Sequence, residues 1–203
     1  MRYYPAFLDI EGKRCVVVGG GVVAARKAEA LLRAGGLVRV VAPKIRPEIR
    51  RLRGIEWRRA RYSARELDGA WLVIAATNDR RVQRAVWQDA ARRGILCSLA
   101  DCAARSNFLS PAAFRRGDLQ VAVSTGGAAP ALARRVRGEL EKVFGPEYGE
   151  LLALLRELRP RVLAGVAAGR RRERFRRMVD SAALDLLRQG RRDEARRLLE
   201  SFL

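Results

Sequence analysis

The chain has 203 residues, a formal net charge of +20 and an apolar share of 49%. This length suits one ordinary domain and a smaller one, and the apolar share is enough to form a buried core. No segment approaches the apolar length of a membrane span, and the first residues lack the long apolar run of a signal peptide. We therefore expect no membrane insertion and a cytoplasmic location.

The chain contains no histidine, so the commonest general base and metal ligand of proteins is missing. Cys15 and Cys97 lie in apolar segments, where a small buried side chain is expected, and Cys102 follows the second of these segments. The cysteine spacing fits neither a zinc site nor a disulfide framework, so no metal site is predicted. Acid–base chemistry must then come from carboxylates, tyrosines, lysines or thiols.

The most informative motif stands at the end of the first predicted strand. Apolar residues 15–18 run into Gly19-Gly20-Gly21-Val22-Val23-Ala24, and an Ala/Arg/Leu-rich helix follows up to residue 34. In this Gly-x-Gly-x-x-Ala pattern Gly19 permits a tight turn, Gly21 leaves room for a pyrophosphate, and Ala24 lets helix and strand pack closely. The unpaired N–H groups at the start of the helix favour the phosphates. The motif therefore indicates a dinucleotide-binding turn.

The residues around this turn support a Rossmann βαβ unit. A second strand is predicted over residues 37–41, so the unit fits into about 30 residues, as this motif requires. The acidic residue that usually binds the ribose follows such a strand, but Pro43 and Lys44 stand there instead. Either backbone groups hold the ribose, or Lys44 and Arg46 favour the extra phosphate of NADP. These residues leave NAD and NADP open, and a nucleotide-free α/β domain with the same turn is the alternative.

Further strands are predicted over residues 55–60, 71–76 and 95–100, with a helix over 80–92. Ligands of a doubly wound sheet bind beyond the carboxyl ends of its strands. Thr77, Asn78 and Asp79 follow one strand and are therefore site candidates, although Asn78 or Asp79 can equally cap the helix that follows. The fold class predicted is α/β, with a Rossmann-type doubly wound parallel sheet.

A second glycine turn comes later in the chain. A strand over residues 119–123 closes on Ser124-Thr125-Gly126-Gly127, and a helix is predicted over 130–143. This turn is either an anion site that includes the Ser124 and Thr125 hydroxyls or an ordinary capping loop. From Pro146 onward the pattern is helical only, over 148–163, 170–187 and 193–202, which places a domain boundary near residue 145. The helical tail covers a substrate cleft or packs against a second subunit.

The positive charge is spread along the chain and comes almost entirely from arginine. Its field attracts polyanions, which permits nucleic acid and favours a multiply carboxylated small molecule. Aromatic residues make up only 6% of the chain, whereas a nucleic-acid surface usually interleaves them with basic residues. We therefore expect no specific nucleic-acid partner. The alternative function is a basic Rossmann-fold protein that binds nucleic acid or senses NAD without turnover.

Several segments together resemble the precorrin-2 dehydrogenase and sirohydrochlorin ferrochelatase family of sirohaem synthesis. They are residues 4–8, 16–24, 26–27, 75–79, Asp101, Phe108, Pro111 and 123–130. The resemblance implies an NAD-binding Rossmann domain over 1–110, a small dimerisation segment over 111–145 and a helical domain over 146–203, assembled as a homodimer. It also implies the NAD-dependent oxidation of precorrin-2 to sirohydrochlorin. Some family members insert iron as well, a step in which Asp101 could serve as the base, but the absence of histidine and of clustered acidic ligands argues against a strong iron site in this chain.

The same resemblance implies roles for individual residues. Cofactor contacts are implied at Val22, Val23, Pro43 and Lys44, and the missing ribose acid becomes a family trait that favours NAD. They add to the contacts predicted from the motif at Gly19 and Gly21 and from the sheet edge at Thr77 and Asn78. Asp101 takes the catalytic role, and in a chain without histidine a carboxylate is the base available. A loop or cap aspartate is the alternative. Ser124, Thr125 and Gly126 would bind the polycarboxylated tetrapyrrole substrate, with unspecified arginines pairing with its other carboxylates.

Overall fold

The computed structural model describes residues 3–203, so Met1 and Arg2 of the predicted first domain lie outside the described residues. The chain divides into two compact units: one runs up to Ser110 and includes Gly126–Ala128, and the other comprises Pro111–Thr125 and Ala129–Leu203. Among the described helices, none has both the length and the apolar character needed to cross a membrane.

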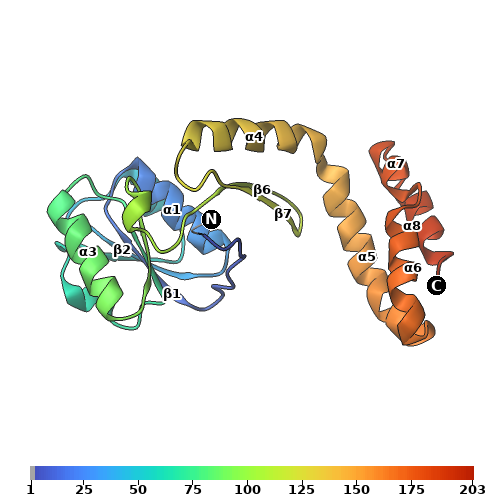
Figure 1. The fold of residues 1–203 in the computed structure, drawn as a ribbon, viewed down its shortest axis with the longest axis horizontal. Coiled ribbons are helices and arrows are strands. Elements are labelled where there is room, and N and C mark those ends of the chain that lie inside the picture. The colour runs from blue at the N-terminus through green and yellow to red at the C-terminus, as the bar shows by residue number, and fades with distance from the viewer. Residues whose placement is uncertain (1–2) are drawn as a thin grey trace. The chain divides into compact units, whose positions relative to one another are not determined.

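The first unit is built on a parallel sheet with the strand order β3-β2-β1-β4-β5; Figure 1 labels its strands β1 and β2 beside the helices α1 and α3. Its strands are β1 (Arg14–Val18), β2 (Leu37–Val41), β3 (Ile55–Arg58), β4 (Leu72–Ala75) and β5 (Leu96–Leu99). The order reverses between β1 and β4, and in open α/β sheets such a reversal marks the ligand-binding crevice. The predicted doubly wound parallel sheet is confirmed.

Helices cover both faces of this sheet. Alternate residues of β1 explain why: Cys15 and Val17 pack with α1 (Val22–Arg33) and α2 (Pro47–Arg51), whereas Val16 and Val18 face the opposite layer. That layer contains α3 (Arg80–Arg92) and a 3₁₀ turn, η1 (Ala64–Leu67). Because neither face meets water, β1 is apolar at nearly every position rather than alternating.

The second unit consists of a β-hairpin and helices. The antiparallel strands β6 (Ala112–Arg116) and β7 (Leu119–Val123) precede α4 (Pro130–Val143). A separate apolar core unites α5 (Pro146–Gly165), α6 (Ala168–Val179), α7 (Ala183–Arg188) and α8 (Arg192–Glu200). A short 3₁₀ turn, η2 (Ala103–Arg105), belongs to the first unit.

One predicted helix is divided in the structure. The pattern predicts a single helix over 170–187, but α6 ends at Val179 and α7 begins at Ala183. The Ser181 hydroxyl donates to the Met178 carbonyl at 2.7 Å and accepts from the Ala183 N–H at 3.3 Å. Such local side-chain bonds compete with the helical ones, which explains the break.

The helical core should tolerate truncation poorly. Leu154 of α5 is fully buried, so Leu154→Ala should lower the free energy of unfolding by about 2–5 kcal/mol through lost transfer energy and a cavity. Leu163 of the same helix is 38% exposed, and Leu163→Ala is the matched control, with a loss below about 1 kcal/mol. Urea unfolding followed by circular dichroism measures both. Equal losses would contradict the separate core.

Candidate functional site

The glycine turn after β1 lies against the ends of two neighbouring strands. Gly19 has φ +130°, a backbone conformation that residues with a side chain rarely adopt. Its N–H donates to the carbonyl of Val41, the last residue of β2, at 2.9 Å. A Cβ on Gly19 would lie 2.2 Å from the carbonyl oxygen of Ala76, which follows β4. The turn can therefore form only with glycine at this position.

The next glycine brings the segment after β2 to the turn. A Cβ on Gly20 would lie 1.9 Å from the Lys44 carbonyl oxygen, and the Gly20 carbonyl accepts from the Arg46 N–H at 3.0 Å. Pro43 and Lys44 thus lie beside the predicted cofactor turn. Glu48 lies 3.0 Å from the Arg46 guanidinium, and this hydrogen bond lowers the pKa of the Glu48 carboxyl. Arg46 is therefore already paired with an acid.

The start of α1 is open in front of the third glycine. Within the described residues, no heavy atom lies within 4 Å of a Cβ placed on Gly21, and Val22 and Val23 are exposed. Gly21 offers no side chain to cap the helix, so the first N–H groups of α1 depend on an external acceptor. A helix start of this kind attracts phosphate. The turn therefore fits the pyrophosphate of a dinucleotide.

Of the residues after β4, one caps the helix α3 and another is exposed at the carboxyl edge of the sheet. Asp79 caps α3, because its carboxylate accepts from the N–H groups of Arg81 at 2.8 Å and Val82 at 3.3 Å. Its own N–H donates to the Thr77 hydroxyl at 3.3 Å. The sequence predicted that either Asn78 or Asp79 caps this helix, and in the structure the cap is Asp79. Asn78 is exposed at the same carboxyl edge.

Asp101 follows β5 and is held by a residue that the sequence analysis did not identify. The Gln83 side-chain amide donates to the Asp101 carboxylate at 3.0 Å and to the Thr77 carbonyl at 2.6 Å. Gln83 is only 7% exposed, although Asp101 itself is open to solvent. The sequence does contain a signal for a buried Gln83, because this residue stands three positions before the apolar Val86 and therefore on the core-facing stripe of α3. A fixed and accessible carboxylate can accept a proton.

The second glycine turn lies across the boundary between the two units. Ser124 and Thr125 belong to the second unit and Gly126 to the first. The Thr125 hydroxyl accepts from the Ala129 N–H at 3.1 Å, immediately before α4. Thr125 therefore takes part in the local turn that leads into this helix.

The remaining predicted site residues, from Gly19 to Asp101, all follow the carboxyl ends of strands of the parallel sheet or begin the adjoining helix.

Cys15 and Cys97, the two cysteines in predicted strands, are buried as expected. Burial raises the pKa of each thiol to about 11. Cys102 is half-buried and directly follows Asp101. Across residues 3–203, no group of three or more Cys, Asp or Glu side chains is arranged to hold a metal ion.

Three family models match successive parts of the chain. Residues 6–112 match a family described as "Putative NAD(P)-binding", residues 116–142 match "Sirohaem biosynthesis protein central", and residues 147–203 match "Sirohaem synthase dimerisation region". The first of these covers more than half of the chain and includes every residue discussed above at the carboxyl edge of the sheet.

The chain is also similar to longer relatives and to a solved structure. It is 41% identical to the sirohaem synthase of Chromobacterium violaceum, over 98% of this chain and 43% of that one. It is 40% identical to the sirohaem synthase of Methylococcus capsulatus, with the same two coverages. The chain thus spans less than half the length of these curated relatives. The solved structure of SirC, a precorrin-2 dehydrogenase, matches with a TM-score of 0.81 and 27% identity, over 98% of this chain and all of that one.

The glycine turn yields a matched pair of substitutions. Gly21→Ala places a methyl group in open space, so it should fold normally but weaken NAD binding about tenfold or more by blocking the approach of the pyrophosphate. Gly20→Ala drives the same methyl group into the Lys44 carbonyl and should lower the melting temperature instead. Calorimetric titration with NAD and thermal unfolding separate the two effects. Unchanged NAD affinity in folded Gly21→Ala would remove the turn from the cofactor site.

The thiols should differ in reactivity because the thiolate is the reacting form. At pH 8 the raised pKa of about 11 keeps Cys15 and Cys97 protonated, and both are buried, so iodoacetamide should label Cys102 first. The two buried thiols should react only after unfolding, or slowly as the pH approaches 11. Peptide mass mapping after timed alkylation measures this order. Early labelling of Cys97 in the folded protein would contradict the packing of β5.

Proposed function

The chain belongs to the NAD(P)-binding family and contains the central and dimerisation regions of sirohaem biosynthesis proteins, and from this premise we propose that it oxidises precorrin-2 to sirohydrochlorin with NAD. One observation supports this proposal most strongly. Asp101, held by buried Gln83, follows a strand of an NAD(P)-binding sheet in a chain whose whole length resembles a precorrin-2 dehydrogenase. The reaction is oxidative, and a nicotinamide cofactor with a nearby base is what it requires.

The cofactor in this proposal is bound at the carboxyl edge of the sheet. Its contacts are assigned to Gly19, Gly21, Val22, Val23, Pro43, Lys44, Thr77 and Asn78. When bound, NAD supplies the hydride acceptor. NAD is favoured over NADP because Arg46, one of two cations near the ribose position, is already paired with Glu48. The carboxylate of Glu48 would also repel an additional phosphate there.

The catalytic step assigned to this chain is a proton transfer. Oxidation removes one hydride and one proton from precorrin-2, and bound NAD would be the acceptor of the hydride. Asp101 accepts the proton on its carboxylate and later releases it to solvent, to which the residue is open. The Gln83 amide keeps that carboxylate in one orientation through its bonds to Asp101 and Thr77. Gln83 is thus a positioning residue.

The proposal extends to the substrate turn and to the assembly. Ser124, Thr125 and Gly126 are assigned to the binding of one substrate carboxylate. The chain is assigned three functional parts: a cofactor domain over 1–110, a dimerisation segment over 111–145 and a helical domain over 146–203. The family description puts a dimerisation region at 147–203, so we assign the homodimer contact to helices α5–α8 together with the segment 111–145. The reaction is placed in the cytoplasm, where NAD is available.

Asp101→Asn should lower turnover by roughly 10²–10⁴-fold and leave NAD binding unchanged. The substitution preserves shape but removes the proton acceptor, and general-base catalysis contributes roughly 10²–10⁴-fold. Anaerobic incubation of precorrin-2 with NAD, following NADH and sirohydrochlorin together, measures the rate. Gln83→Leu should lower kcat because it releases the Asp101 carboxylate, and its effect on NAD affinity should be smaller, since the glycine turn is untouched and only the Thr77 carbonyl loses its donor.

The control for these variants is Arg61→Gln, at an exposed position after β3. It should retain the wild-type rate. Turnover at the wild-type rate in Asp101→Asn would preserve the reaction and remove Asp101 from its role. A wild-type protein that binds NAD but leaves intact precorrin-2 unchanged would favour an NAD-binding protein without turnover.

A further inference from the structure

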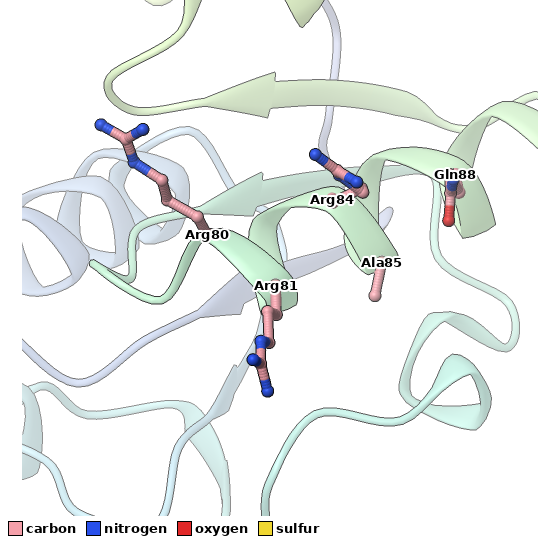
Figure 2. Close-up of a pocket in the computed structure, with 5 residues that line it drawn as sticks. All are labelled: Arg80, Arg81, Arg84, Ala85 and Gln88. Carbon is pink, nitrogen blue, oxygen red and sulfur yellow. The ribbon is translucent and has the colours of Figure 1, made fainter.

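The N-terminal half of α3 carries three arginines at its exposed face. Arg80, Arg81 and Arg84 line a hollow of about 390 Å³ together with Ala85 and Gln88 (Figure 2). Within residues 3–203, none of these three guanidinium groups forms an ion pair with an acidic side chain. At the other end of the same helix, Arg92 and Arg93 are paired with Asp89 and Asp68. The free charge is therefore confined to one end of α3.

This arrangement costs folding stability. Arg80 and Arg81 occupy the first positions of the helix, where the helix dipole is positive and cations are unfavourable. Arg80 and Arg84 are four residues apart, so their like charges also repel on the helix surface. The first turn of α3, which is described throughout, contains no acidic residue, and the Asp79 carboxylate is engaged by backbone N–H groups. A bound anion would reduce both the unfavourable interaction of these arginines with the helix dipole and the repulsion between Arg80 and Arg84.

The position of this hollow connects it to the proposed reaction. Gln83, which holds Asp101, lies on α3 between Arg81 and Arg84 in the sequence. Arg80 stands three residues before Gln83, so the two lie within one helical turn, although Gln83 is buried on the core-facing stripe of α3 and Arg80 is exposed. Arg80 also follows Thr77-Asn78-Asp79 at the carboxyl edge of the sheet. The basic hollow thus begins within one helical turn of the residue that positions the candidate base.

We propose that Arg80, Arg81 and Arg84 bind carboxylate side chains at the periphery of the tetrapyrrole substrate. This inference rests on the proposed function, since that function supplies a substrate with several carboxylates. The planar guanidinium group forms two parallel hydrogen bonds with a carboxylate, and the Gln88 amide adds a further donor. The residues that line the hollow are arginine, alanine and glutamine, and the nearest exposed aromatic side chain on this helix is the single Trp87, three residues after Arg84. One aromatic ring does not make the series of stacking platforms that a nucleic-acid surface uses, so a polycarboxylate is favoured.

The test uses binding rather than turnover, with the octacarboxylate tetrapyrrole uroporphyrin as probe. The double variant Arg80→Gln/Arg84→Gln should weaken uroporphyrin binding by about tenfold per arginine, the usual size of a charge-assisted hydrogen bond. The matched control is Arg53→Gln/Arg65→Gln, which removes the same charge from exposed positions outside the hollow and should change affinity less than about twofold. NAD affinity should stay constant in both variants, and the first should melt no lower than wild type.

Three other results of these binding measurements would each overturn the proposal. Equal losses in the two variants would mean a general attraction to a positively charged protein. Unchanged uroporphyrin affinity in Arg80→Gln/Arg84→Gln would mean that the hollow is not a carboxylate site. A loss of affinity for short duplex DNA, with uroporphyrin binding retained, would assign the hollow to nucleic acid.

The test also separates this inference from the proposed function. If wild type binds uroporphyrin through these arginines but does not oxidise precorrin-2, the carboxylate site stands and the proposed reaction is wrong. If the double variant oxidises precorrin-2 with unchanged kcat and KM, the reaction stands and the site is wrong.

Discussion

The backbone of Gly19 and Gly20 lies against two carbonyl groups, and this close approach organises the carboxyl edge of the sheet. A Cβ on either residue would come within 2.2 Å of the carbonyl oxygen of Ala76 or Lys44. Because both glycines lack a side chain, the segments that follow β1, β2 and β4 meet at one place. The start of α1 is left uncovered there, so a helix N-terminus and the ends of several strands can share a ligand.

The adjoining site is organised by one buried amide. Both donor bonds of Gln83 are used, one on the Thr77 carbonyl and one on the Asp101 carboxylate, so its burial leaves these hydrogens satisfied. The amide joins the segments that follow β4 and β5, which are neighbouring strands of the sheet. An aspartate on a loop would otherwise adopt many orientations. Here its carboxylate is fixed by a helix that is itself packed against the core.

Charge is distributed differently at the two ends of α3. Toward its C-terminus the arginines have acidic partners, which agrees with the helix dipole and with the usual arrangement of a basic surface. Toward its N-terminus, Arg80, Arg81 and Arg84 oppose the dipole and one another. Natural proteins accept local instability of this kind where a ligand is bound, because the groups that recognise it must stay unpaired until it arrives.

The sequence by itself determined the doubly wound sheet and the glycine turn, because both are written in short local patterns: an apolar run, three glycines, and the periodic helix that begins at Arg80. The tertiary structure alone decided that Asp79 and not Asn78 caps α3, that Lys44 lies against Gly20, and that Gln83 holds Asp101. It also revealed the break between α6 and α7. The reason is physical: these outcomes depend on contacts between distant residues and on side-chain orientations, which periodicity and spacing do not encode.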